Sequence, residues 1–323
     1  MRRRYLLGGM IALPGVTRAQ NTPKTARVAL LTGLGEDDPA TKARLAGFRA
    51  GMAALGWRED RNLVLDVRYA PSSAERASRL ATELVALKPD VGVMQGMPSV
   101  IASREATAAL PIVFIGIPDP VGAKLVESLS RPGVNMTGLT STEPSFGAKW
   151  IELLKEISPG TRRLLVMTQQ SAALYKPSIE QAAGQFGVAV SYAQVGSERD
   201  IQTAIDGFAG AGSDGGLILP TDLYTAGHRQ QIIALAARHK LPLITGNPPF
   251  PIDGGLMYYG ADFVDLYRRA AGYVDRILRG MRPADLPIQQ PTMFQMSINL
   301  RTAAALGLVV PPSILSRADE VIE

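Results

Sequence analysis

The chain has 323 residues, 46% of them hydrophobic, and a formal net charge of +5. It contains no cysteine, which excludes disulfides, thiolate metal sites and cysteine nucleophiles. A chain of this length usually forms two domains rather than one, and its hydrophobic content is sufficient for the core of each.

Residues 1–19 have the order of features that is typical of a cleavable export signal. Three arginines, Arg2–Arg4, precede a short apolar run that ends at Val16, and Ala19 is a small residue before a cleavage point. The run is shorter than the about 20 residues that span a bilayer. The segment therefore predicts export to the periplasm, by the general secretory or the twin-arginine route. Its removal lowers the basic residues from 34 to 30 against 29 acidic ones, which argues against a nucleic-acid partner.

From Arg27 onward, short β-branched runs alternate with helical patterns, which is typical of a parallel sheet covered by helices. Leu45, Phe48 and Met52, for example, recur at three- and four-residue spacing and predict one apolar helix face. In this half we expect strands at 27–33, 62–69, 91–95 and 112–117, and helices at 41–55, 74–87 and 99–109.

The same alternation restarts at Phe146. Here we expect helices at 146–157, 172–186, 199–209 and 225–239, and strands at 163–168, 188–195, 217–219 and 241–245. Two successive α/β sets of similar size predict an α/β protein of two lobes, each a doubly wound, Rossmann-like sheet.

The remaining segment has too few elements for a third domain. A loop rich in proline and glycine at 246–255 precedes a strand at 256–260, a helix at 262–280, an extended stretch at 287–300 and a helix at 301–306. We therefore expect the chain to cross back between the lobes. The first lobe would comprise residues 24–140 and 258–285, and the second would comprise residues 141–257 and 286–323. Several crossings form a hinge, and a hinge between two lobes allows a cleft to close on a ligand.

The sequence has few of the patterns that an enzyme needs. His228 and His239 lie about 16 Å apart along one predicted helix, which is too far for both to bind one metal ion. The glycines at 33 and 35 follow a strand, but Asp38 occupies the third glycine position of a dinucleotide-binding loop. We therefore expect a protein that is not an enzyme and that uses no cofactor and no metal.

Ligands of open α/β sheets bind beyond the carboxyl ends of the strands. The loops at these ends, and Tyr259 on the strand between the lobes, supply the candidate ligand-binding residues. These are Thr32, Gly33, Gly96, Met97, Ser99, Pro118, Asp119, Gln169, Ser171, Thr221, Asp222, Asn247 and Tyr259. Ser99 and Ser171, each near a helix start, could bind a ligand carboxylate, and Asp222 could bind an ammonium group. Serine and aspartate are also common helix N-caps, so for Ser99, Ser171 and Asp222 capping a helix is the alternative to binding a ligand.

A family resemblance is carried by short segments spread over nearly the whole chain after residue 19. They are residues 47–56, 87–90, 111–114, 118–122, 129–133, 135–138, 254–260, 265–278, 305–308 and 311–312. In their order and spacing they resemble the periplasmic substrate-binding proteins of ABC importers with a type I binding-protein fold. The branch they resemble includes tryptophan- and tyrosine-binding homologues.

The resemblance implies two lobes joined by three crossings, a small-molecule ligand in the cleft, and an ABC permease in the inner membrane as partner. It also implies a monomer without catalytic activity, whose ligand-contacting loops fall at 96–99, 168–171 and 220–222. One position departs from the amino-acid-binding members, since Leu223 stands where they tend to carry a polar residue. An aromatic or aliphatic carboxylate is therefore as credible a ligand as an amino acid. An exported α/β enzyme and a periplasmic ligand sensor remain the alternatives.

Overall fold

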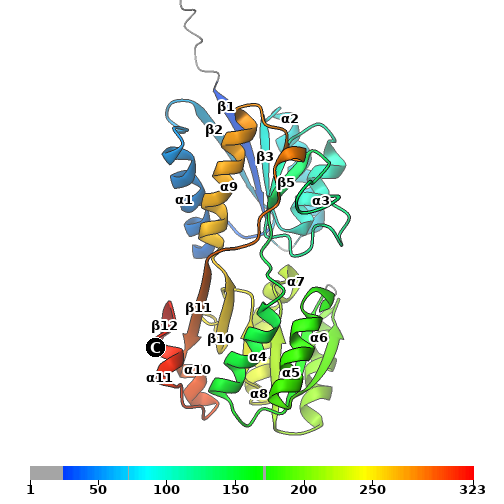
Figure 1. Cartoon of the computed structure of the whole chain (residues 1–323), viewed down its shortest axis with the longest axis vertical. Helices are drawn as coiled ribbons and strands as arrows, with labels where there is room; N and C mark the ends of the chain where they lie inside the picture. Colours follow the sequence, from blue (N-terminus) through cyan, green and yellow to red (C-terminus); the bar gives the residue numbers. More distant parts are fainter. Residues whose placement is uncertain (1–24, 72, 170–171) are drawn as a thin grey trace, which may run out of the picture.

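The computed structural model describes residues 25–71, 73–169 and 172–323, and the expected export signal lies outside these residues. The described chain forms two α/β lobes arranged along the long axis of the molecule (Figure 1). One lobe contains a five-stranded sheet and the other a seven-stranded sheet. None of the helices in these ranges is long and apolar enough to cross a bilayer.

The first lobe is built on a parallel sheet with the order β2-β1-β3-β4-β5. Helices α1 and α9 cover one face, and helices α2 and α3 cover the other. The side chains of Val28 and Leu30 point to the first face and that of Leu31 to the second, because successive residues of a strand alternate. The bounds are β1 (Ala26–Thr32), α1 (Pro39–Ala54), β2 (Leu63–Tyr69), α2 (Ala74–Ala86), β3 (Val91–Gln95), α3 (Met97–Ala106), β4 (Ile112–Ile115), β5 (Met136–Leu139) and α9 (Phe263–Leu278).

The second lobe contains the sheet β12-β11-β10-β9-β8-β6-β7, in which only the pair β10–β11 is antiparallel. Helices α4, α5, α10 and α11 pack on one face and α6 and α8 on the other. The bounds are α4 (Phe146–Ile157), β6 (Arg163–Thr168), α5 (Lys176–Phe186), β7 (Ala189–Gln194), α6 (Glu198–Gly210), β8 (Gly215–Leu219), α7 (Leu223–Gly227), α8 (Arg229–Arg238), β9 (Leu243–Thr245), β10 (Met257–Ala261), β11 (Phe294–Asn299), α10 (Leu300–Ala305), α11 (Pro312–Leu315) and β12 (Glu320–Ile322). With helices on both faces of both sheets, the expected doubly wound α/β class is confirmed.

The chain passes between the lobes three times within the described residues. The first crossing joins β5 to α4, the second joins β10 to α9, and the third leads to β11 after the short helix η2 (Pro283–Asp285). Figure 1 shows α9 beside α1 in the first lobe, although the strands that flank α9 in sequence lie in the second lobe. The last two crossings are hydrogen-bonded to each other, since Asp262 N donates to Met293 O at 3.0 Å.

Two of the expected lobe boundaries are displaced. Residues 258–261 belong to β10 in the second sheet, so the second crossing follows Ala261 instead of preceding residue 258. Leu286 and Ile288 are buried in the cores of the first lobe, and Gln289 forms a β-bridge with Leu139. The third crossing therefore begins after residue 289 and not after 285.

Two helices that were expected to be continuous are interrupted. The stretch 172–186 divides into the 3₁₀ helix η1 (Ala172–Leu174) and α5, and the stretch 225–239 divides into α7 and α8. His228 stands at the junction of α7 and α8, where its ring stacks on Tyr224 with 4.2 Å between the ring centroids. His239 caps the opposite end of α8 and contacts Asp206. Both histidines thus lie at helix ends.

Candidate ligand-binding site

A cavity of about 440 Å³ lies between the two lobes. Its walls include residues that follow β1, β3 and β4 in the first lobe and β6, β8 and β9 in the second. This is the edge to which the carboxyl ends of parallel strands point, so both sheets contribute loops to one space. The volume is that of a site for a small organic molecule.

Seven of the thirteen candidate residues line this cavity. They are Gly96, Met97, Pro118, Gln169, Thr221, Asp222 and Asn247. The first three come from the first lobe and the other four from the second, so the structure brings these strand-end loops together at one cavity.

Three candidates of the first lobe do not line the cavity. Thr32 is buried behind Gln95, and its Oγ1 donates to Gln95 Oε1 at 2.9 Å. Ser99 is buried within the first turn of α3. Asp119 is exposed and accepts a hydrogen bond from Gly122 N at 2.8 Å, which makes it a turn-capping residue.

The other three candidates lie beside the cavity, against the core of the second lobe, or outside the described residues. Gly33 lies next to the cavity, where its N–H donates to Gln95 Oε1 at 3.0 Å. Tyr259 was expected to face the cleft, but its ring packs against Phe146, with centroids 5.6 Å apart, in a core of the second lobe. Alternation along β10 directs Tyr259 to the α4 side of the sheet, which is why it misses the cavity. Ser171 lies outside the described residues.

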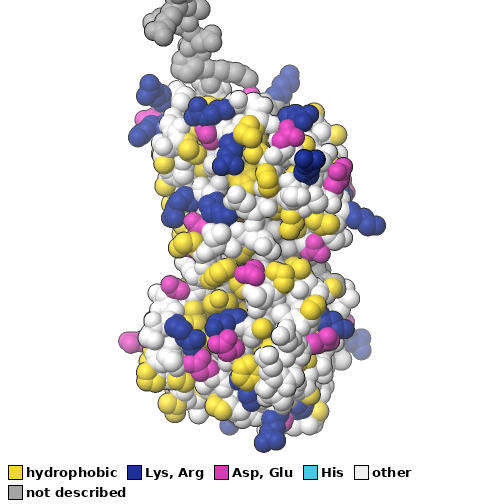
Figure 2. All heavy atoms as spheres, viewed as in Figure 1, with side chains coloured by type: hydrophobic (Ala, Val, Ile, Leu, Met, Phe, Trp, Pro, Cys, Tyr) yellow, Lys and Arg dark blue, Asp and Glu magenta, His cyan; other side chains and the backbone are white. Residues whose placement is uncertain are grey.

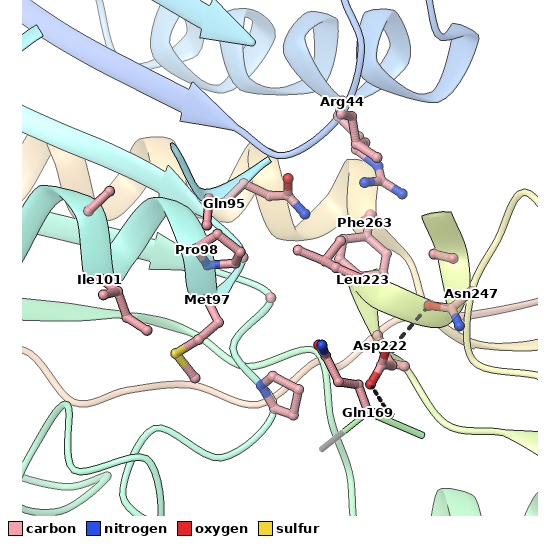
Figure 3. Close-up of a pocket in the computed structure, with 18 of the residues that line it drawn as sticks. Arg44, Gln95, Met97, Pro98, Ile101, Gln169, Asp222, Leu223, Asn247 and Phe263 are labelled. Atoms are coloured by element: carbon pink, nitrogen blue, oxygen red, sulfur yellow. Dashed lines mark hydrogen bonds between the residues drawn. The ribbon is translucent and has the colours of Figure 1, made fainter. Parts of the chain in front are cut away.

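Asp222 connects the loops of the second lobe. Its Oδ1 accepts from Thr225 N at 2.8 Å and thereby caps α7, and its Oδ2 accepts from Thr168 Oγ1 at 2.8 Å and Gln169 N at 2.9 Å. Its own N–H donates to Asn247 Oδ1 at 3.1 Å, one of the bonds drawn in Figure 3. The side chain is buried, and these bonds hold the ends of β6, β8 and β9 in fixed relative positions. The capping role that was the alternative for Asp222 is thus present in the structure.

Leu223 brings the lobes into contact at the cavity. A Cβ added at Gly33 would lie 3.5 Å from Leu223 Cδ1, and one added at Gly96 would lie only 2.5 Å from it. Gly96 also has a φ of +79°, a conformation that disfavours residues with a side chain. Glycine at this position allows the α7 side of the second lobe to approach the start of α3.

Arg44 is a cavity residue that the sequence interpretation did not select. It projects from α1 and its guanidinium lies 4.3 Å from the centroid of the Phe263 ring (Figure 3). Only 5% of the residue is exposed, and burial lowers the pKa of the guanidinium. Arg44 forms no side-chain hydrogen bond or ion pair with any described residue. Arg44 precedes Phe48 by four residues and so lies on the apolar stripe of the predicted helix, and this spacing could have indicated that it is buried.

Gln95 is the second residue that was missed. It ends β3 and is 3% exposed, and its Oε1 accepts from Thr32 and Gly33. Because Oε1 is the acceptor in both bonds, the amide nitrogen is the atom left to face the cavity, as Figure 3 shows. A polar residue at the carboxyl end of a buried strand was the signal that could have identified it.

The charges at the cavity are few. Arg44 is the one basic side chain among the described residues that line it, and the acidic ones are Asp222 and the exposed Glu105. Among the described residues, no group of three or more His, Asp or Glu side chains is arranged to hold a metal ion. On the face drawn in Figure 2, acidic and basic side chains are interspersed over both lobes.

The fold and the cleft agree with a family comparison. Residues 34–322 match the family model described as ABC transporter substrate binding protein. The chain belongs to this family. The match spans both lobes and all three crossings, so the family assignment concerns the complete two-lobed unit.

Several known proteins resemble the chain over most of its length. A protein named tyrosine-binding protein from Clostridioides difficile is 25% identical over 275 residues, which are 84% of this chain and 79% of that protein. A crystal structure of a conserved domain protein from Vibrio cholerae is 30% identical, with a TM-score of 0.81 over 92% of this chain and 100% of that one. An ABC domain from Streptococcus pneumoniae in complex with L-Trp is 24% identical, with a TM-score of 0.81 over 93% of this chain and 100% of that one.

Proposed function

We propose that the chain is the solute-binding component of an ABC import system and captures a small organic ligand in the cleft between its lobes. The ligand would be an amino acid or an aromatic or aliphatic carboxylate. The observation that carries the proposal is the cavity of about 440 Å³, whose walls come from both lobes at the ends of their strands. A ligand in this position contacts both lobes only when they are together, so its binding favours closure.

The hinge supports the same mechanism. Three crossings connect the lobes, and Leu223 of the second lobe reaches the glycines at 33 and 96 of the first. In this mechanism the lobes open and close by rotation at the crossings, while each lobe keeps its own core. The Clostridioides difficile relative, which is named for tyrosine binding, supports a small ligand with a carboxylate.

The proposed location and partners follow from the first residues and from the family. Residues 1–19 predict export, which supports a proposed location in the periplasm and an ABC permease of the inner membrane as partner. We propose that it acts there as a monomer, with a small molecule and the permease as its partners and without nucleic acid. We also propose that it binds its ligand without converting it.

A thermal-shift screen of residues 20–323 tests the function. The panel contains amino acids, aromatic acids, short-chain carboxylates, nucleobases and sugars. A ligand at a hundred times its dissociation constant stabilises the folded state by about 2.7 kcal/mol, which raises the melting temperature measurably.

The chemical state of the recovered ligand separates the alternatives. A saturable ligand that is recovered unchanged supports a solute-binding protein. A ligand that is converted to product contradicts the proposal and favours the exported enzyme. The absence of any binding across all five classes would also contradict it. Transport and sensing are then distinguished by uptake of the labelled ligand in cells with and without the gene.

A further inference from the structure

Two buried hydrogen-bond donors of the first lobe face the cavity without partners among the described residues. One is the guanidinium of Arg44 and the other is the amide nitrogen of Gln95. Their residues are 5% and 3% exposed, respectively. A buried cation without a counter-ion is unfavourable in a folded protein unless a ligand supplies the missing charge.

The acidic residues nearest to Arg44 do not supply that charge at contact distance. Asp38 caps α1 by accepting from Ala40 N at 2.8 Å, and Asp262 caps α9 by accepting from Val264 N at 2.8 Å. Both carboxylates raise the pKa of Arg44 through space, but burial outweighs them. Neither lies within ion-pair distance of the guanidinium, which stacks on Phe263 instead.

The start of α3 is a weaker site for an anion. The N–H of its N-cap residue Gly96 already donates to Ile115 O at 3.0 Å, and Pro98 in the first turn has no N–H. Ser99 is buried beneath the cavity wall instead of lining it. An anionic group therefore finds its strongest donors at Arg44 and Gln95, because a planar guanidinium pairs with a carboxylate through two parallel bonds.

Among the described residues of the wall, the opposite side of the cavity has one buried carboxylate, that of Asp222. Asp222 uses both carboxylate oxygens to accept bonds from the protein, namely from Thr225, Thr168 and Gln169. The other acidic side chain of the wall, Glu105, is exposed to solvent. Much of the remaining wall is apolar. It includes Met97, Pro98 and Ile101, which lie on the left in Figure 3, across the cavity from Arg44 on the right.

Building on the proposed function, we infer that the ligand is an organic carboxylate with an apolar body and that Arg44 and Gln95 bind its anionic group. The apolar body lies along the wall formed by Met97, Pro98 and Ile101. We expect an ammonium group to be dispensable in the ligand, since Asp222 already accepts three hydrogen bonds that hold the loops together. An amino acid binds through its carboxylate, and its amino group adds little affinity.

Matched compounds test the ligand class. Isothermal titration of the purified protein compares a carboxylate, its amide, the amino acid and the amine in each of two series. The aromatic series is phenylpropanoate, phenylpropanamide, L-phenylalanine and phenylethylamine. The aliphatic series is isocaproate, isocaproamide, L-leucine and isoamylamine. We expect the carboxylate and the amino acid of at least one series to bind with similar dissociation constants, and its amide and amine to bind at least about 100-fold more weakly. Equal binding of the amide or amine, or binding of the amino acid alone, would overturn the inference.

The outcome distinguishes this inference from the proposed function. Binding of sugars or nucleobases, with none of the eight compounds bound, would overturn the carboxylate assignment and leave a solute-binding protein. Failure of every solute to bind would instead remove the proposed function itself.

Substitutions at the two donors test the residues. Arg44→Met should raise the dissociation constant of the bound carboxylate about 100-fold, and Gln95→Glu should do the same by placing a negative charge at the site. Arg44→Lys should bind with intermediate affinity, because it keeps the charge but not the paired geometry. Arg49→Met, on the solvent side of α1, is the matched control and should bind like the wild type.

The stability of the ligand-free variant separates binding from a structural role. Arg44→Met should melt at the wild-type temperature or above, because it removes a buried charge that has no ion-pair partner. A lower melting temperature together with an unchanged dissociation constant would show that Arg44 is structural and would overturn the inference.

Discussion

Asp222 illustrates how one buried carboxylate organises the wall of a cavity through the hydrogen bonds that it accepts. Its oxygens satisfy an amide of α7, the hydroxyl of Thr168 and the amide of Gln169. Three loops that would otherwise be independent are therefore fixed relative to one another at the cavity.

Replacement of this carboxylate should cost stability. We expect Asp222→Ala to lower the free energy of unfolding by about 2 kcal/mol, since it removes a helix cap and leaves buried donors unsatisfied. Urea unfolding followed by circular dichroism measures the change. Asp119→Ala, which removes one exposed turn-capping bond, should change the free energy of unfolding by less than about 1 kcal/mol. Equal effects of the two substitutions would contradict the organising role.

At the residue scale, the sequence predicted which loops lie at the cavity better than it predicted what each side chain does there. Loops at strand ends were identifiable because the β-branched runs end abruptly, and seven of the candidates do meet at the cavity. Arg44 was missed because an arginine in an amphipathic helix usually faces solvent, although its spacing from Phe48 places it on the stripe that packs on α9. Tyr259 was misplaced because the face to which its ring points depends on the position of β10 in the second sheet.

At the scale of elements, long periodic segments were predictable and short ones were not. The helix α4 and the strands β3 and β6 have the expected bounds, because each combines strong periodicity or β-branched content with clear ends. The strand β5 was not expected, since it has four residues, includes glycine and is held by pairing with β4. The helix expected at 172–186 is interrupted before Lys176 because Pro177 cannot continue a helix from its preceding turn.

Tyr175, at the start of α5, gives this element a pH-dependent contribution to stability. Burial raises the pKa of its phenol to about 12, and its hydroxyl donates to Thr142 Oγ1 at 3.3 Å. The phenol in the unfolded chain ionises near its ordinary value of about 10. Its contribution is therefore complete below about pH 10 and declines as the pH rises towards 12, because only the unfolded state loses the proton in that window.

Removal of this hydroxyl should flatten the alkaline loss of stability. We expect the free energy of unfolding of Tyr175→Phe to fall less steeply than that of the wild type between about pH 10 and 11.5. Urea titrations at several pH values give the slopes. Tyr192→Phe is the comparison: burial also raises the pKa of Tyr192, but this residue is 38% exposed, so its removal should flatten the slope less than Tyr175→Phe does. Parallel curves for Tyr175→Phe and the wild type would contradict the assignment.

At the scale of the whole molecule, the two-lobed architecture followed from the repeated α/β alternation, which needs only local patterns. The points of crossing did not follow, because they depend on which sheet accepts β10 and on the pairing of residues 286–289 with β5. Such pairings join residues that are far apart in the sequence, so they cannot be predicted from the local patterns of a single sequence.

The contact made by Leu223 should influence the equilibrium between open and closed lobes. Leu223→Ala removes apolar contact worth about 1 kcal/mol, which favours the open form by about fivefold. We expect a larger radius of gyration for the ligand-free variant in small-angle X-ray scattering and weaker binding of the ligand. Leu315→Ala, at an exposed position of α11, should leave both quantities unchanged. An unaltered radius and affinity in Leu223→Ala would show that this contact does not hold the lobes together.

The crossings also constrain the order in which the protein can fold during synthesis. The sheet of the first lobe is complete at Leu139, but α9, which covers one of its faces together with α1, begins only at Phe263. A nascent chain on the ribosome must therefore leave the part of that face that α9 covers exposed while most of the second lobe is being made. Cleavage at any single crossing would release neither lobe as an independent folding unit. We therefore expect kinetic traps and chaperone binding mainly in chains whose synthesis has stopped between Leu139 and Phe263.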